Sequence, residues 1–247
     1  MNSLETDLER ARDLDVAALA DAIESIGFEC TDCGACCRAA DAGCGDGEDS
    51  GHGEREQEQA QTAEPHTATV FPDEVRRLQV TGGHEYDWRD VARPVPYGLS
   101  DGPDGPTGET FEWALQTDGC GDCRFHEGGE GGGCTVHEDR PLICRTYPFS
   151  VALGGTSQPM GEAVDDEGLV RAHKCEGLGR DIDREAAEEL ARALKTRAVR
   201  ELEEAIGVRE SYEPVDPAET AEGVVVHDSE GAKRPDGTRL EDGDRSR

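Results

Sequence analysis

The chain has 247 residues, enough for one domain of ordinary size with tails, or for two small domains at most. Asp and Glu number 56 against 25 Lys and Arg, which gives a formal net charge of −31. A surface this acidic repels nucleic acids and anionic membranes, so neither is an expected partner.

The first predicted element is a helix near residues 4–26, which makes residues 1–27 an N-terminal helical segment. Asp15 can cap a helix start and Gly27 can end the helix. Apolar side chains recur at the three- and four-residue spacing of one helical face: Val16, Leu19, Ile23 and Ile26.

A dense cysteine run follows this helix directly, so it lies on a loop that leaves the helix. The run reads Cys30-Thr-Asp-Cys33-Gly-Ala-Cys36-Cys37. Residues 39–66 are then rich in Gly, Glu and Gln, with almost no apolar side chain. This composition predicts a flexible insertion.

Short elements are predicted in the middle of the chain. Residues 69–75 indicate an extended piece and then a helix that begins at Pro72 and Asp73 and ends near Gly82.

Residues 111–115 alternate apolar and polar side chains, as a strand does. Glycine-rich loops surround this strand at 101–108 and 127–133. Residues 140–150 predict one helical turn that leads into an extended piece through Ala152.

The longest predicted helix spans about 182–206, where Asp181 or Asp183 can cap the start and Gly207 can close the end. Its apolar stripe is Ile182, Ala186, Leu190, Leu194, Ala198, Leu202 and Ile206. Residues 211–247 are rich in Pro, Gly and charge, which predicts a disordered acidic tail.

The spacing of the clustered cysteines favours metal chemistry over disulfide chemistry. Thiolates at Cys30, Cys33 and Cys36 can turn onto one soft metal, because each two-residue spacer lets the backbone curl around it. Cys37 points elsewhere and can serve a second centre or close the first. Neighbouring cysteines bridge each other only with strain, so disulfides do not need such crowding.

The apolar content is low, since Leu, Ile, Val and Phe total 41 of the 247 residues. This is below the roughly one-fifth that marks a disorder-prone composition, so the apolar core must be small. A structural zinc site contributes on the order of 10–16 kcal/mol of apparent binding energy. Typical net folding stability is only about 5–15 kcal/mol, so metal occupancy alone could decide whether the middle of the chain folds.

The N-terminus is acidic and lacks the features of a secretion signal, and no stretch approaches the ~18 apolar residues of a membrane span. We therefore expect a cytoplasmic protein, in which thiols stay reduced and cysteine clusters favour metal. The acidity suits a very salty, halophile-like cytoplasm, or simply a generally acidic protein. The ten cysteines leave five disulfides as an alternative.

The segment from Cys134 to Phe149 is specific in itself, and with the cysteine run it resembles the YkgJ-type cysteine-cluster family, the CxxCxxCC domain. The resemblance extends from about Phe28 to Cys175. It rests on the cysteine run and on Arg140-Pro141, Cys144-Arg145, Pro148-Phe149 and the Glu-Gly that follows Cys175. The family is described as a zinc- or iron-chelating domain and is often labelled an iron–sulfur protein or oxidoreductase. Some relatives are linked to lysine methylation on flagellins.

The resemblance implies eight metal ligands, which divide into two four-coordinate sites whose membership stays open. They are Cys30, Cys33, Cys36, Cys37, Cys123, Cys134, Cys144 and Cys175. Cys44 and Cys120 fall outside the pattern. Cys44 is expected to be a free thiol in the insertion, and Cys120 a bystander or a substitute for Cys123.

Histidines are weaker candidates. His126 and His137 follow Cys123 and Cys134 at ligand-like spacing, but relatives carry an apolar residue and a tyrosine there, so both are expected at the surface or rim. His173 is either a group that supports the metal ligands or a solvated residue. The histidines expected in disordered segments are His52, His66 and His227.

Arg140 and Arg145 flank Cys144, and a guanidinium can hydrogen-bond a metal-bound sulfur or a neighbouring carbonyl. Both arginines are therefore candidate cofactor-binding residues, with simple pairing to Asp or Glu as the alternative for Arg140.

The predicted fold is α+β: a small, irregular, cysteine-rich and metal-stabilised domain over 28–210, with few short strands, clasped by the N- and C-terminal helices. The predicted function is a metal-binding protein with iron–sulfur or Zn²⁺ centres, possible redox chemistry and metal ions as its partners. Two alternatives are an enzyme or accessory in flagellin-type lysine methylation, and a thiol-rich metal store.

Overall fold

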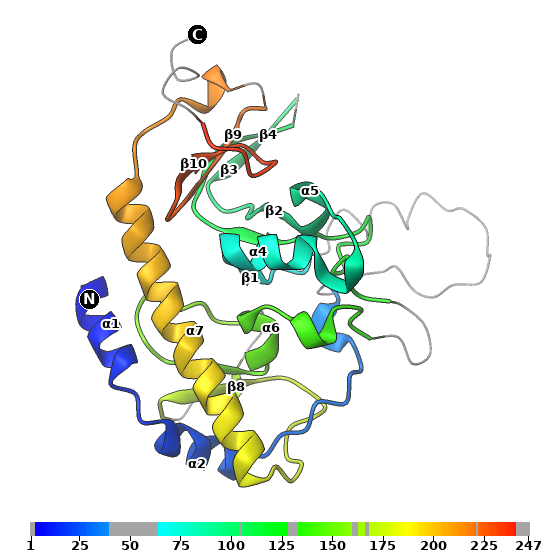
Figure 1. Cartoon of the computed structure of the whole chain (residues 1–247), viewed down its shortest axis with the longest axis vertical. Helices are drawn as coiled ribbons and strands as arrows, with labels where there is room; N and C mark the ends of the chain where they lie inside the picture. Colours follow the sequence, from blue (N-terminus) through cyan, green and yellow to red (C-terminus); the bar gives the residue numbers. More distant parts are fainter. Residues whose placement is uncertain are drawn as a thin grey trace, which may run out of the picture.

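The computed structural model describes residues 3–39, 64–103, 105–127, 133–159, 163–165, 168–220 and 222–240. Helices and small sheets are combined, which confirms the predicted α+β class. In Figure 1 the long helix α7 (Arg184–Ser211) runs along much of the long axis of the molecule. None of the helices in the described ranges combines the length and the apolar character that a membrane crossing requires.

The N-terminal segment forms two helices instead of one, α1 (Leu4–Arg12) and α2 (Val16–Ile26). The carboxylate of Asp15 accepts the backbone N–H of Ala17 at 2.8 Å and so begins α2. Gly27 ends α2 with φ 76°, as predicted. Because Asp15 caps the start of a second helix, the segment predicted as one helix is divided into two.

The long helix α7 confirms the prediction over 182–206, with Asp183 as its N-cap. It continues through Gly207, where the sequence predicts its end. A Cβ at Gly207 would lie 2.6 Å from Cβ of Ser229, so the missing side chain lets a later turn of the chain pack on the helix. This packing extends α7 by more than a turn.

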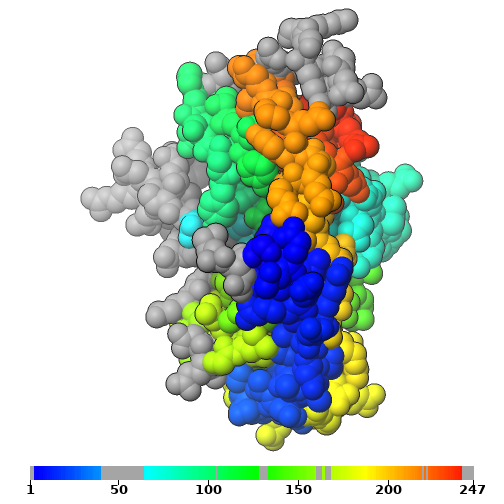
Figure 2. Space-filling model, turned by 90° about the vertical axis from the view of Figure 1, so that its left-hand side faces the viewer, coloured from blue at the N-terminus to red at the C-terminus, as the bar shows by residue number. Residues whose placement is uncertain are grey.

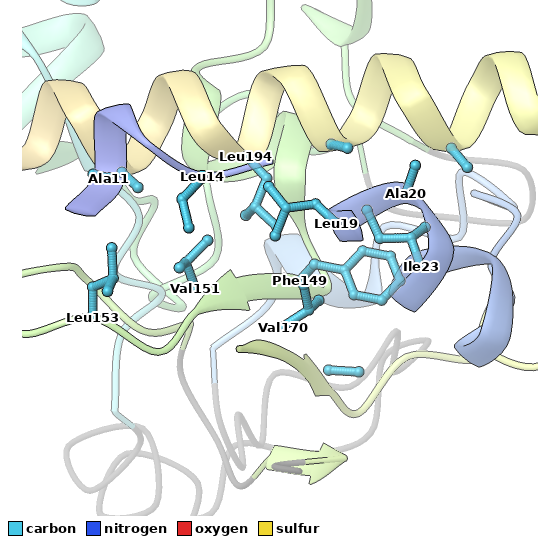
Figure 3. Close-up of a cluster of buried hydrophobic side chains, with 14 of the residues drawn as sticks. Ala11, Leu14, Leu19, Ala20, Ile23, Phe149, Val151, Leu153, Val170 and Leu194 are labelled. Carbon is cyan, nitrogen blue, oxygen red and sulfur yellow. The ribbon is translucent and has the colours of Figure 1, made fainter. Parts of the chain in front are cut away.

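The first apolar cluster lies between the N-terminal helices and α7. Figure 2 shows the blue N-terminal segment lying along the yellow and orange α7, so the terminal helices pack on each other. Phe149 and Ile23 are fully buried in this cluster, where Figure 3 shows the ring of Phe149 close to Ile23. The cluster contains no cysteine.

A three-stranded sheet in the order β6-β8-β7 completes this first cluster. The strands are β6 (Phe149–Val151), β7 (Ala163–Asp165) and β8 (Val170–His173). The helical turn predicted before the first of them is α6 (Leu142–Thr146).

The second apolar cluster is built on a sheet in the order β1-β5-β2, with the helices α4 and α5 beside it. The bounds are β1 (Thr69–Val70), α4 (Pro72–Gln79), α5 (Trp88–Val91), β2 (Ala92–Pro94) and β5 (Trp113–Leu115). The predicted strand and the predicted helix start at Pro72 are confirmed. Cys123 is buried in this cluster, and other cysteines pack against it.

The C-terminal segment differs from the predicted disordered tail. Residues 222–240 include the strands β9 (Val224–Asp228) and β10 (Gly231–Lys233). β9 pairs in parallel with β4 (Gly105–Thr110), which forms a hairpin with β3 (Leu99–Gly102) where a glycine-rich loop is predicted. The partner strand is over 100 residues away in sequence, so local composition gave no sign of the pairing.

Short helical turns lie between the longer elements. They include η1 (Ala35–Cys37), η2 (Thr81–Gly83) and η4 (Pro217–Glu219). The predicted flexible insertion at 39–66 falls mostly on residues 40–63, which lie outside the described residues.

A buried ion pair lies within α7, and its arginine also contacts the segment around α6. Nε of Arg197 lies 2.8 Å from Oε1 of Glu201, and the two side chains are 3% and 10% exposed. Arg197 also donates to the hydroxyl of Thr146 and to the carbonyl of Ser157. Burial nevertheless raises the pKa of Glu201, so the carboxylate depends on the guanidinium to stay ionised.

We expect Arg197→Met to lower the free energy of unfolding by about 3–5 kcal/mol, because it leaves Glu201 buried without its cation. The control Arg192→Met breaks an exposed pair with Glu188 at the same four-residue spacing on the same helix. It should cost about 0–1 kcal/mol. Urea unfolding followed by circular dichroism measures both, and equal losses would contradict the proposed role of the buried pair.

Candidate metal centre

The cysteine loop, residues 30–37, forms a tight curl after α2. Asp32 and Gly34 both have positive φ, 52° and 69°, and the N–H of Cys37 donates to the carbonyl of Gly34 at 2.9 Å. The left-handed backbone suits glycine, so Gly34 allows the turn between the second and third cysteines. Cys30 and Cys36 are exposed, and Cys33 and Cys37 are partly buried.

Cys175 is brought to the cysteine loop by backbone pairing. The N–H of Glu29 donates to the carbonyl of Gly177 at 3.0 Å, and the N–H of Gly177 donates to Sγ of Cys175 at 3.4 Å. Hydrogen bonds from Thr31 and from the thiol of Cys33 lower the pKa of Glu176. A residue late in the chain is thereby fixed beside the first two cysteines of the loop.

Cys123 and Cys134 meet the other end of the loop. The N–H of Cys123 donates to the carbonyl of Cys37 at 2.7 Å. Cys134 lies in an antiparallel bridge with His126, whose own N–H donates to Cys123. The side chain of Asp32 packs on Gly133, where a Cβ would lie 2.6 Å from its carboxylate.

Cys144 is presented by α6, which a buried carboxylate anchors. Oε1 of Glu74 accepts the N–H of Leu142 at 2.9 Å, and its other oxygen accepts the N–H of Phe71. Glu74 is 1% exposed, and burial raises its pKa. Burial, and then the nearby thiols of Cys123 and Cys36, raise the pKa of Cys144 well above 9.0.

The described thiols form two electrostatic neighbourhoods that share Cys36. Burial first, and then Cys33, Cys36 and Cys30, raise the pKa of Cys175. Burial likewise raises the pKa of Cys123 to about 12, with Cys134 and Cys36 adding to the effect. We call Cys30, Cys33 and Cys175 the first thiol group. The second thiol group is Cys37, Cys123, Cys134 and Cys144.

The thiols of Cys36 and Cys37 shift each other's ionisation. A hydrogen bond from Cys37, and then the charge of Arg140, lower the pKa of Cys36 from 9.0 to about 7. The same contact, together with burial, raises the pKa of Cys37. Of these two neighbours, Cys36 is therefore the one that ionises more readily, at the junction of the two groups.

The two predicted arginines differ in position. Arg140 lies close enough to Cys36 and Cys134 to lower the pKa of both, against the opposing effect of burial on Cys134. Arg145 lies 4.0 Å from the carboxylate of Glu189. Nε of Arg140 donates to the carbonyl of His137, the first residue of the short helical turn η3 (His137–Asp139). Arg140 directly follows this turn and so holds the segment together.

Two residues near the first thiol group, Tyr147 and Glu176, were not among the predicted site residues. Burial, and then Cys175, raise the pKa of Tyr147 to about 12. Both residues lie in segments that carry the family resemblance, Tyr147 before Pro148 and Glu176 in the Glu-Gly after Cys175, so the resemblance is the signal that could have found them.

Several histidines differ from expectation. His66 and His227 are buried, not disordered, and His173 is 4% exposed, not solvated. Burial lowers the pKa of His66 to about 4. His137 is at the rim, 3.5 Å from Glu138. His52 lies outside the described residues.

All eight predicted ligands are free thiols, which excludes the alternative of five disulfides. Cys120 is disulfide-bonded, and Cys44 lies outside the described residues. In the described ranges no three His, Cys, Asp or Glu side chains are already arranged to hold a metal ion. The thiols therefore need side-chain rotation to ligate, on a backbone that already brings their segments together.

Comparison with known families identifies the domain in which these thiols lie. A family model described as "CxxCxxCC: Putative zinc- or iron-chelating domain" matches residues 29–176. No curated protein and no solved structure matches the chain.

Without metal, we expect iodoacetamide to label Cys36 before any second-group thiol at pH 7, because its lower pKa supplies more thiolate. Arg140→Gln should raise the pKa of Cys36 and slow its labelling by about two- to tenfold. The control Arg145→Gln should leave the rate unchanged. Peptide mapping by mass spectrometry measures each rate, and equal slowing by both variants would contradict the role of Arg140.

Proposed function

The chain belongs to the CxxCxxCC family, whose domain is described as zinc- or iron-chelating, and we propose that it is a cytosolic metal-binding protein with two four-sulfur centres. The observation that carries this proposal is the backbone pairing of the segments that bear eight free thiols. Soft thiolate ligands in sets of four suit zinc and iron–sulfur clusters alike. A reducing cytosol would keep the thiols available.

The chemistry of the donor set fits a cation. Each second-group thiol is kept neutral by burial and by its neighbours, since several thiolates cannot be charged together in one place. A bound metal supplies the missing positive charge and displaces the protons. Metal affinity should therefore fall as the pH falls, because protons then compete for the same sulfurs.

The assignment of Cys36 determines how the eight sulfurs divide between the two centres. Its spacing from Cys30 and Cys33 is the one that lets three thiolates share a centre, and Cys175 lies beside them. We assign Cys36 to the first thiol group, so that each group has four sulfurs. Cys37 then belongs with the second thiol group, to which its carbonyl is already hydrogen-bonded through Cys123.

The second centre would also complete a core. Cys123 is part of the second apolar cluster, and Cys37, Cys134 and Cys144 pack against it. A metal held by these four would join the loop, α6 and the β1-β5-β2 sheet. The first apolar cluster has no cysteine and needs no metal to pack.

The separation into two centres is tested by two variants. Cys175→Ser and Cys134→Ser should each lose about half of the bound metal, because each removes one ligand from a different four-sulfur set. Cys120→Ser in reducing buffer is the matched control and should keep all of it. Elemental analysis after anaerobic purification measures the metal content, and loss of all metal in both variants would contradict two independent centres.

The same purification distinguishes the metals and the redox proposal. Iron–sulfur protein would be brown, with absorption at roughly 400 nm and a reversible redox couple. Colourless protein with stoichiometric zinc would reject the redox reading. Variable metal content would favour the metal store instead.

A cavity favours a second candidate, a role in lysine methylation. The cavity of about 260 Å³ opens beside α7, and its lining includes Ile143, the residue before Cys144. Its lining includes the aromatic residues Phe71, Phe111 and Trp113 and the acidic residues Glu112, Glu201, Glu204 and Asp228, together with Arg197, which is already paired with Glu201. Aromatic faces and carboxylates attract alkylammonium groups. Burial, and then the two other glutamates, raise the pKa of Glu112, so a cation would relieve this repulsion.

This candidate requires that a flagellin peptide containing lysine binds to the metal-loaded chain and that Glu112→Gln weakens the binding. Isothermal titration measures both, with the same peptide bearing glutamine for lysine as the control. Equal binding of the two peptides, and no methyl transfer to flagellin, would remove the candidate.

A further inference from the structure

His126 is held by its backbone between two cysteines of the second thiol group. Its N–H donates to the carbonyl of Cys123 at 2.9 Å, and it forms an antiparallel bridge with Cys134. These contacts fix the direction of the side chain. Its ring therefore points from the second group toward the cysteine loop.

The ring of His126 lies against Gly34, between Cys33 and Cys36. A Cβ at Gly34 would lie 2.3 Å from Nε2 and 2.7 Å from Cδ2 of the imidazole. The edge of the ring that carries Nε2 thus occupies the place of a side chain on the loop. Gly34 is required here both by its positive φ and by this close approach.

Nε2 of His126 is fully buried and has no hydrogen-bond partner in the described part of the chain. Buried polar atoms are paired in the great majority of cases, so an orphan nitrogen indicates a partner that arrives with a ligand. The nitrogen lies against Gly34 of a loop that carries four cysteines, and the backbone of His126 contacts Cys123 and Cys134. A metal-bound thiolate is a hydrogen-bond acceptor, and N–H donors to bound sulfur tune metal centres.

We propose that His126 donates its Nε2–H to a metal-bound sulfur of the cysteine loop, as a positioning residue that joins the two centres. This inference rests on the proposed function. His126 is not a ninth ligand, because the eight thiols already complete two sets of four. Its role is to offset part of the excess negative charge of the thiolates and to hold the loop against the second thiol group.

The test uses the full chain loaded with zinc or reconstituted with iron, whichever the wild type binds. His126→Phe keeps the ring and removes the donor, whereas His126→Gln keeps an N–H donor. His137→Phe is the matched control, since the side chain of His137 lies at the rim beside Glu138. Elemental analysis gives the metal content, and transfer to excess EDTA gives the release rate.

We expect unchanged metal content in all three variants. His126→Phe should release metal about 10–100-fold faster than the wild type, the usual effect of losing a partner of a ligand. His126→Gln should stay within about threefold of the wild-type rate. This variant still tests the inference if the phenylalanine variant does not fold.

Three results would overturn the inference. They are a wild-type release rate in His126→Phe, the loss of one centre's metal, which would make His126 a ligand, and a glutamine variant that releases metal as fast as the phenylalanine variant. A wild-type chain that binds no metal would instead overturn the proposed function, and the inference with it.

Discussion

Mutual repulsion between thiolates is the constraint on which the site depends. Backbone pairing brings the segments of eight thiols together, and in the second thiol group burial and neighbouring sulfurs keep the thiols neutral. A neutral set of crowded thiols is a set of metal ligands that still carry their protons. Arg140 favours ionisation of Cys36 and Cys134, but a single cation cannot serve eight sulfurs. A metal cation is the partner that this arrangement lacks.

Two kinds of interaction stabilise different parts of the fold. The helices α1, α2 and α7 pack with β6 and β8 around apolar side chains alone. Around the cysteines, polar anchors hold the backbone instead: Glu74 holds the start of α6, and Arg197 reaches α6 from α7 through Thr146. These anchors fix the segments and leave the sulfurs to be joined by a ligand.

Much of this fold could be predicted from local sequence. Periodic apolar residues and the caps at Asp15 and Asp183 predicted the helices, and cysteine spacing together with the family resemblance predicted the set of thiols. Two features could not be predicted, because they depend on distant partners. β9 gains its order from β4, and Gly207 stays helical because Ser229 packs on it. His126 looked like a rim residue because spacing cannot show that its ring reaches Gly34.

The most direct test of the central claim is backbone hydrogen exchange of the full chain with and without bound metal. Metal should slow exchange at the cysteine loop, at Cys123, Cys134 and α6, while α7 and α2 keep the same protection in both states. Identical exchange at the cysteine loop and α6 in the two states would show that the sulfurs do not hold this part of the chain through a metal.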